Sequence, residues 1–209
     1  MQKIIKNFPL SISKLHSQKA FKQKKPKKSP IAVSYLGFNN LEIWSNNSLS
    51  CAYFFSNLFA FRPIFFSNSY TGNKNFEEFV LKNGKVFLSI KSPILPENSA
   101  FQKFLGKHGD TIKKVVIFVK NLKALHENLL RQNVDSRVFT YNSEQQILEI
   151  CLFGQIVYKF VQSPQNIYTS QPPKYLKPVD SKTGWDTMNK LLPTPEYNKI
   201  DHVGFPQFP

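Results

Sequence analysis

The sequence is poor in cysteine, arginine and glycine. Its 209 residues contain two cysteines, three arginines and eight glycines. Cys51 and Cys151 are too few and too far apart to form a disulfide framework or a cysteine metal site. We therefore expect both to be free thiols in the core of a protein from a reducing compartment. The glycines form no GxGxxG or Walker-type loop, which excludes the common glycine-rich phosphate-binding motifs.

No long uninterrupted hydrophobic run is present either. The most apolar stretch, residues 51–66, is broken by Ser56, Asn57, Arg62 and Pro63. It is therefore shorter than the roughly 18 to 20 apolar residues that a membrane-spanning helix needs. No apolar segment follows the first lysines, so we expect neither a secretory signal nor an integral membrane protein. Hydrophobic residues make up 41% of the chain, which is enough for one globular domain with extensions.

Acidic residues are absent from residues 1–30, which hold nine of the 28 Lys and Arg residues in a chain of net charge +15. Residues 1–20 are mildly amphipathic and resemble a mitochondrial targeting segment, although they lack arginine. Residues 21–30 are basic and contain prolines. We expect residues 1–30 together, which we call the basic arm, to contact RNA phosphate or anionic lipid; the alternative is a solvated terminus without a partner. The predicted contact residues are Lys19, Lys22, Lys24, Lys25, Lys27 and Lys28.

Residues 164–209 show no sustained helical or strand period and hold eight of the 14 prolines. Such a sequence predicts an extended tail, because proline interrupts helices and internal strands. Large apolar residues are spaced along it, and they could anchor the tail on a neighbouring subunit. The alternative is that the tail folds back on its own domain. The predicted anchors are Tyr168, Tyr175, Trp185, Leu191 and Phe205.

The region between these extensions, residues 31–163, contains one order of elements twice. In the first copy, about 35–95, a strand is predicted at 38–44 and a helix follows, marked by Leu49, Tyr53 and Leu58. Strands are then predicted at 61–66, 76–81 and 86–90, with a hairpin turn at Asn83-Gly84. The adjacent Glu77 and Glu78 should point to opposite faces of their strand.

The second copy, about 108–163, begins with a predicted strand at 113–119. Asn121 is a helix N-cap candidate, and Leu122, Leu125 and Leu129 follow at helical spacing. Strands at 138–141, 147–153 and 155–161 complete the copy, with Gly154 in the last turn. Each copy alone is too small to bury both faces of its sheet. We therefore predict an α+β domain in which two βαβββ modules form one curved mixed sheet with the helices outside.

This arrangement resembles the vicinal oxygen chelate superfamily, which contains glyoxalases and extradiol dioxygenases. Local sequence is similar to the N-terminal half of the 4-hydroxyphenylpyruvate dioxygenase family. Residues 35–44 (YLGFNNLEIW) resemble that family's opening strand, usually Gly-Phe-Asp-His-(Val/Leu)-Glu-Phe-Trp, and residues 200–204 (IDHVG) resemble the start of its C-terminal half. Further matches in the same order are Ala52-Tyr53-Phe54, Phe61-Arg62-Pro63, Ser92-Pro93 and His108-Gly109-Asp110.

What the resemblance implies about chemistry is mostly negative. The family's iron is held by two histidines and a glutamate in the C-terminal half, and His202 matches the first of them. The sequence ends seven residues later, so we expect His202 to be an orphan and no iron to be bound. Single-pair glyoxalases place metal ligands at positions that correspond here to Asn40, a residue near Ser89, Lys114 and Gln162. Only Gln162 is a plausible ligand among these, and an ammonium such as that of Lys114 repels a divalent cation.

No other catalytic arrangement is evident, because the four histidines are scattered and neither cysteine has a nearby histidine. We expect a non-catalytic subunit, without cofactor, of a large mitochondrial assembly in the matrix or on the matrix side of the inner membrane. The positive charge favours the mitochondrial ribosome over a respiratory-chain complex. The alternatives are an active glyoxalase-like or dioxygenase-like metalloenzyme and a small-molecule-binding module.

Overall fold

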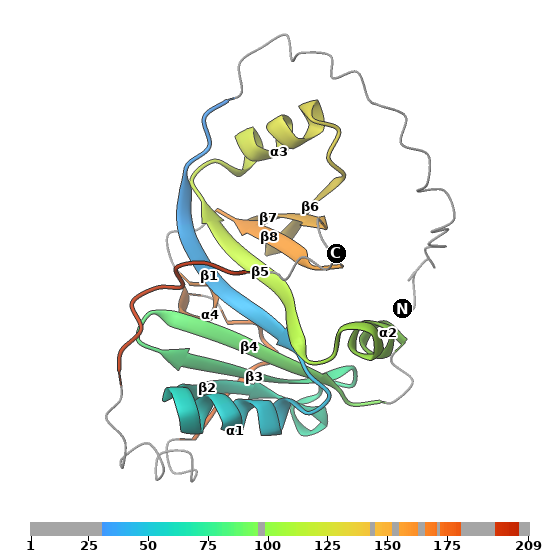
Figure 1. The fold of residues 1–209 in the computed structure, drawn as a ribbon, viewed down its shortest axis with the longest axis vertical. Coiled ribbons are helices and arrows are strands. Elements are labelled where there is room, and N and C mark those ends of the chain that lie inside the picture. The colour runs from blue at the N-terminus through green and yellow to red at the C-terminus, as the bar shows by residue number, and fades with distance from the viewer. Residues whose placement is uncertain are drawn as a thin grey trace.

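The structure is a computed structural model of the chain, shown in Figure 1. It describes residues 31–95, 99–142, 145–151, 155–162, 166–170, 172–180 and 195–204. The predicted basic arm, the turn at Gly154 and three of the predicted tail anchors (Trp185, Leu191 and Phe205) lie outside these ranges.

Two modules with the same order of elements supply eight strands of one mixed sheet, as predicted, and β9 (Lys177–Pro178) adds a ninth (Figure 1). The strand order is β6-β7-β8-β5-β1-β4-β3-β2-β9. The first module comprises β1 (Tyr35–Trp44), α1 (Ser48–Phe59), β2 (Arg62–Ser67), β3 (Phe76–Asn83) and β4 (Val86–Pro93). The second comprises β5 (Thr111–Val119), α3 (Leu122–Arg131), β6 (Ser136–Asn142), β7 (Gln145–Cys151) and β8 (Val157–Val161).

The two modules join through their first strands. β1 pairs antiparallel with β5, while each first strand also pairs in parallel with the last strand of its own module, β1 with β4 and β5 with β8. Because β1 and β5 lie side by side in the middle of the sheet, the two modules share one continuous hydrogen-bonded ladder. The predicted fold class is therefore confirmed.

The predicted hairpin between β3 and β4 is also present. Asn83 is the register partner of Val86, so the turn residues are Gly84 and Lys85. Gly84 has a φ of +55°, and a Cβ added there would lie 2.5 Å from the Tyr197 carbonyl oxygen. The Lys85 N–H donates to that same carbonyl at 2.8 Å. Glycine is needed here both for the left-handed conformation and for the close approach of the C-terminal segment.

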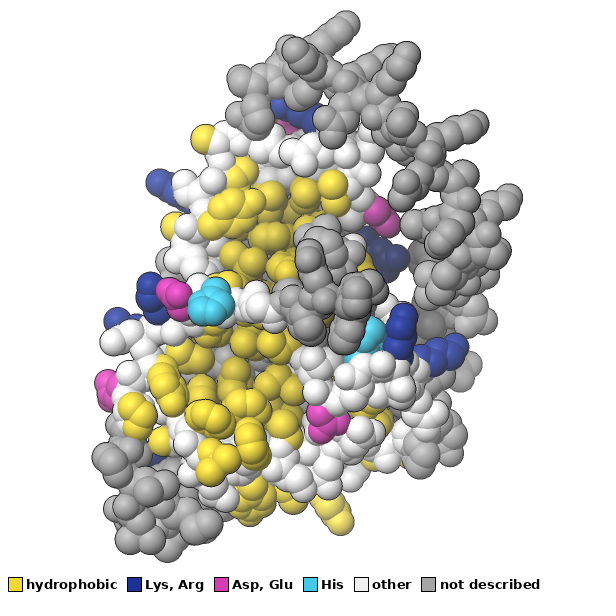
Figure 2. All heavy atoms as spheres, viewed as in Figure 1, with side chains coloured by type: hydrophobic (Ala, Val, Ile, Leu, Met, Phe, Trp, Pro, Cys, Tyr) yellow, Lys and Arg dark blue, Asp and Glu magenta, His cyan; other side chains and the backbone are white. Residues whose placement is uncertain are grey.

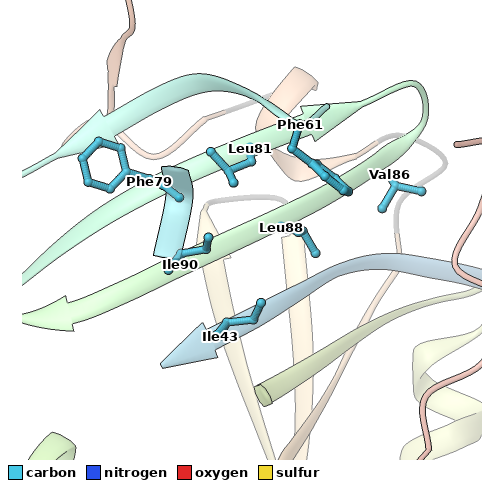
Figure 3. Close-up of a cluster of buried hydrophobic side chains, with 8 residues drawn as sticks. Ile43, Phe61, Phe79, Leu81, Val86, Leu88 and Ile90 are labelled. Atoms are coloured by element: carbon cyan, nitrogen blue, oxygen red, sulfur yellow. The ribbon is translucent and has the colours of Figure 1, made fainter. Parts of the chain in front are cut away.

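α1 packs on the first module's sheet through small residues. The Asn47 side chain caps the helix by accepting a hydrogen bond from the Ser50 N–H. The buried residues of the helix are Ser48, Ala52 and Ser56. They let the helix approach a cluster of apolar side chains from β1, β3, β4 and the residue before β2 (Figure 3). That cluster consists of Ile43, Phe61, Phe79, Leu81, Val86, Leu88 and Ile90, together with Ala52.

The residues that made the helix recognisable in the sequence lie on its other side. Leu49, Tyr53 and Leu58 are 40%, 46% and 65% exposed, and Phe54 and Phe59 are exposed beside them. We call these five residues the outer apolar face of α1. Figure 2 shows hydrophobic side chains gathered on the surface in this part of the molecule. The helix is thus apolar on the side that faces away from the sheet, the reverse of the usual amphipathic arrangement.

α3 follows the prediction closely. The Asn121 side chain accepts a hydrogen bond from the Ala124 N–H at 2.9 Å and so caps the helix. Leu122 and Leu125 are buried, and Leu129 packs against the same apolar cluster of the second module. For this helix, the capping residue and the 3.6-residue spacing of apolar residues were sufficient to predict both its start and its buried face.

Four described elements were not predicted: the short 3-10 helix η2 (Ser69–Thr71), α2 (Ser99–His108), α4 (Ile167–Ser170) and β9 (Lys177–Pro178). α2 places Phe101 and Phe104 on Trp44, with a centroid separation of 3.9 Å for the stacked Trp44–Phe101 pair. β9 extends the sheet by pairing antiparallel with β2. The described parts of the tail therefore fold back on their own domain, which is the second of the two alternatives.

Cys51 and Cys151 are free, as expected, but they differ in burial. Cys51 is half-buried beside the first module's core, whereas Cys151 is exposed at the end of β7. The prediction that both belong to the core is wrong for Cys151, because the strand alternation turns its side chain away from the α3 cluster. Within the described ranges, no helix has both the length and the apolar character needed to cross a membrane.

Candidate functional site

The candidate site lies on the inner face of the sheet, which we define as the face opposite α1 and α3. Strand alternation places charged side chains from several strands there. Register pairing brings them together, because Glu42 in β1 is opposite Lys114 in β5, and Glu78 in β3 is opposite Lys91 in β4. We call the following residues the central ionic cluster: Glu42, Glu78, Lys91, Lys114 and Glu149.

Lys91 bridges two carboxylates of this cluster. Its Nζ lies 3.0 Å from Glu42 Oε2 and 3.7 Å from Glu78 Oε2. It also lies 4.7 Å from the centre of the Phe76 ring. Both carboxylates receive a further hydrogen bond, from Trp44 Nε1 to Glu42 at 2.9 Å and from the Ser89 hydroxyl to Glu78 at 2.6 Å. The ammonium group is thus the positive charge shared by two almost fully buried carboxylates.

Lys114 extends the cluster into the second module. Its Nζ lies 3.8 Å from Glu42 Oε1 and 3.9 Å from Glu149 Oε1. Lys159 in β8 is the register partner of Glu149 in β7. With Lys159 included, three ammonium groups face three carboxylates across six strands, so the centre of the inner face holds balanced rather than excess charge.

Burial and pairing together decide the protonation of these groups. Burial alone would raise the pKa of Glu42, but the charges of Lys91 and Lys114 and the hydrogen bond from Trp44 outweigh it and lower the pKa to about 2. Burial would likewise lower the pKa of Lys91, but Glu42 and Glu78 raise it well above its usual value. Burial lowers the pKa of Lys159, with a further contribution from the charge of Lys114. Glu42 and Lys91 are therefore held in their charged forms near neutral pH.

The two adjacent glutamates of β3 separate as predicted. Glu78 faces the inner side, where it meets Ser89 and Lys91. Glu77 faces the outer side, where the Ser48 hydroxyl at the start of α1 donates to it at 2.7 Å. Only one of the pair therefore belongs to the candidate site.

Asn40, Lys114 and Gln162, the positions matched by resemblance to metal ligands, do not converge in one group. Lys114 belongs to the central ionic cluster. Asn40 is buried two residues before Glu42 on β1, and its Oδ1 has no hydrogen-bond partner in the described part of the chain. Gln162 is exposed just after β8, and its Oε1 accepts a hydrogen bond from the Leu122 N–H at the start of α3. Its visible role is to cap a helix.

The remaining predicted residues lie elsewhere. His202 is exposed, and its Nδ1 is 3.2 Å from the Asp201 carboxylate. Tyr168 is buried and stacks on Phe87 of its own sheet, with ring centres 6.3 Å apart. Tyr175 is 37% exposed and meets Phe76 edge-on.

Sequence reasoning did not single out Glu42, Lys91 or Glu149, and it named Glu78 only as facing away from Glu77. A signal was present, since each is a charged residue within an otherwise apolar alternating strand. Their mutual pairing depends on a register between strands whose paired residues lie up to 72 positions apart, as Glu42 and Lys114 do, and the sequence does not display that register.

The donor set of this face does not fit a metal ion. A divalent cation needs several carboxylate, imidazole or thiolate ligands free to converge on it. Here the Glu42 and Glu78 carboxylates are already bridged by the Lys91 ammonium. Among the described residues, no group of three or more His, Cys, Asp or Glu side chains is placed to hold a metal.

The chain is similar in sequence to curated 4-hydroxyphenylpyruvate dioxygenases. It is 22% identical to the enzyme of Dictyostelium discoideum over 173 residues, which cover 80% of this chain and 46% of the relative. It is 20% identical to that of Tetrahymena thermophila over 203 residues, which cover 93% and 49%. The chain thus spans about half the length of the curated relatives it matches. No family model matches it.

The fold is similar to that of solved structures as well. A variant of 4-hydroxymandelate synthase from Streptomyces coelicolor superposes with a TM-score of 0.57 at 16% identity, over 71% of this chain and 43% of that protein. The two joined βαβββ modules and the sequence matches agree with each other. Together they indicate the vicinal oxygen chelate superfamily, which this chain resembles in both sequence and fold.

Proposed function

We propose that this chain is a non-catalytic structural subunit of a larger assembly, in which a dioxygenase-like domain serves as a scaffold. The observation that carries the proposal is the Lys91 ammonium between the Glu42 and Glu78 carboxylates. Its positive charge neutralises both carboxylates, whereas a metal ion on the inner face would need ligands that are not already paired.

The protonation of the cluster supports the same proposal. A general base works best with a pKa near the operating pH. Glu42, with a pKa lowered to about 2, is a very weak base, and Lys91, with a raised pKa, holds its proton too firmly to act as a nucleophile. Neither Glu42 nor Lys91 is therefore poised for proton transfer.

The outer apolar face of α1 supports a role in assembly. The twelve residues of α1 include no Asp, Glu, Lys or Arg, although such residues make up 20% of the chain. Contiguous exposed apolar surface is typical of protein contact sites. We infer that another subunit covers this helix.

The basic arm indicates the kind of assembly. Its nine lysines without a single acid suit contact with phosphate, and we place the subunit in mitochondria, on the mitochondrial ribosome in preference to a respiratory-chain complex. A respiratory complex would offer anionic lipid to the same lysines.

The first test is sedimentation of the epitope-tagged full chain from gently lysed mitochondria. We expect it to move with a large particle and to shift to lighter fractions after ribonuclease treatment. Sedimentation with a large particle that ribonuclease leaves intact would favour a respiratory complex. Sedimentation alone, or a stoichiometric metal and turnover in the purified chain, would contradict the proposed function.

A matched pair of variants tests the outer apolar face of α1. Leu58→Glu places a charge on that face, whereas Leu130→Glu places the same charge on the exposed side of α3. We expect the first to release the chain from the particle and the second to leave it bound, with similar thermal stability in both. Equal retention of the two variants would exclude α1 as the contact.

A further inference from the structure

A pocket of about 560 Å³ lies at the end of the inner face away from Trp44, where β1 begins. Its wall comes from the start of β1, the end of β5, the β3–β4 hairpin, α4 and residues 198–200. The volume is within the roughly 300 to 1,000 Å³ that is usual for small-molecule sites. No residue of the central ionic cluster lines it.

The charge of this pocket is of one sign. Lys82, Lys85 and Lys199 line it, and no Asp or Glu among the residues that the structure describes does. Lys199 is paired with Asp201 at 3.2 Å. Lys82 and Lys85 form no ion pair with a carboxylate in the described ranges, although Glu196 lines a smaller neighbouring cavity that shares Lys82. The pocket therefore offers ammonium groups without local neutralisation and suits an anion.

Aromatic and amide groups accompany the lysines. The half-buried Phe38 and Phe118 line the pocket, and Phe87 lies buried beside them. Asn39 is 2% exposed; its Oδ1 accepts a hydrogen bond from Asn166 at 3.0 Å, while its Nδ2 has no partner among the residues described. Aromatic rings stack on planar bases, and carboxamides pair with base edges.

We propose that this pocket binds a nucleotide, with its phosphate at Lys82 and Lys85 and its base against Phe38 and Phe118. Phosphate carries more than one negative charge near neutral pH, which matches the number of unpaired ammonium groups better than a single carboxylate does. The nucleotide is either free or the exposed end of an RNA strand. The RNA form rests on the proposed function, whereas the free form does not.

The test uses the full chain and calorimetric titration with uridine and adenosine 5′-monophosphates, the corresponding nucleosides and inorganic phosphate. We expect the monophosphates to bind about tenfold or more tightly than the nucleosides or phosphate alone, because only they engage both the rings and the ammonium groups. Nucleosides that bind as well as the monophosphates would overturn the proposal, as would a lack of binding by any monophosphate.

Charge-matched variants locate the site. Lys82→Gln combined with Lys85→Gln should weaken monophosphate binding about tenfold or more. Lys103→Gln combined with Lys107→Gln removes the same charge from the exposed side of α2 and should change binding less than about twofold. Equal effects of the two double variants would overturn the proposal, because binding would then follow net charge alone.

A second pair guards against misfolding as the cause of lost binding. Leu36→Glu brings a carboxylate into the pocket at a side chain that is 57% exposed, and Leu95→Glu adds the same charge at an exposed site that does not line it. We expect Leu36→Glu to abolish binding with an unchanged thermal midpoint, and Leu95→Glu to bind normally. Normal binding by Leu36→Glu would contradict the proposal.

A 5′-phosphorylated trinucleotide separates the two sources. Tighter binding of the trinucleotide than of the monophosphates, weakened in the Lys82 and Lys85 double variant, assigns the pocket to an RNA end, and preference for monophosphates assigns it to free nucleotide. The trinucleotide could instead bind equally well to the wild type and to the pocket variants, while no monophosphate binds. That result would overturn this inference but would still allow the proposed subunit to contact RNA elsewhere. If the chain sediments alone but binds monophosphates in a way that depends on the pocket lysines, the inference is supported and the proposed function is contradicted.

Discussion

Glu42 and Lys114 are register partners across the junction of the two modules, and their carboxylate and ammonium groups lie 3.8 Å apart. Glu42 also pairs with Lys91 of its own module at 3.0 Å. One side chain therefore links the charges of both halves of the sheet.

Replacement of Glu42 by glutamine should destabilise the protein by about 3 kcal/mol, because Lys91 would keep only the more distant Glu78 and Lys114 only Glu149. Urea unfolding measures the difference. Glu127→Gln is the control, since it breaks only a partly exposed i,i+4 pair with Arg131 on α3 and should cost less than about 0.5 kcal/mol. Equal costs for the two variants would show that the cluster contributes no more than a surface ion pair.

The Glu42 carboxylate should also make the free energy of unfolding depend on pH in the acidic range. The pKa of Glu42 is lowered from 4.5 to about 2 on folding, so its stabilisation is present in full above pH 4.5 and is lost as the pH falls toward 2. Unfolding free energies of the wild type and Glu42→Gln should therefore converge between pH 4.5 and 2, a change of about 3 kcal/mol in their difference. A difference that stays constant over this interval would contradict the lowered pKa.

Two glycine-to-alanine substitutions should change the free energy of unfolding in opposite directions. Gly84→Ala would push a Cβ against the Tyr197 carbonyl at a positive φ, and should cost about 1 to 3 kcal/mol. Gly106→Ala lies within α2 with open space around it and should stabilise by about 0.5 to 1 kcal/mol. Thermal melting of both variants checks this. An unaffected Gly84→Ala variant would mean that residues 195–204 do not pack on the hairpin.

Gln162 should matter to α3. Gln162→Ala removes the acceptor for the Leu122 N–H and should cost about 1 kcal/mol. Gln162→Glu keeps an acceptor and adds a negative charge at the helix N-terminus, so it should retain full stability. Chemical unfolding of the two variants measures the difference. If Gln162 does not cap α3, both substitutions should leave the free energy of unfolding unchanged.

Local signals predicted much of the fold because they act over a few residues. Asn121 with its leucines identified α3, and Gly84 identified the hairpin. α2 was missed although Phe101 and Phe104 have helical spacing, because Gly106 and the flanking turn residues weaken the pattern. α1 was identified from residues that turned out to face away from the sheet.

The candidate site was harder to predict because it depends on register. Lys114 was singled out from the resemblance, but its partners Glu42 and Glu149 lie 72 and 35 residues away in the sequence. Tyr168 was predicted as an anchor for another subunit, and the structure packs it on Phe87 of the same sheet. Both outcomes depend on which distant segments meet, and no local pattern records that.

The central position of β1 has a consequence for how the chain folds. β1 is hydrogen-bonded to β4 on one side and to β5 on the other. In either module alone, the first strand would be an edge strand with unpaired backbone N–H and C=O groups. Such an edge can pair with strands of other chains and so promote aggregation. The nascent first module is therefore exposed until β5 has been synthesised, and a chaperone that shields β1 in that interval would raise the yield of native protein.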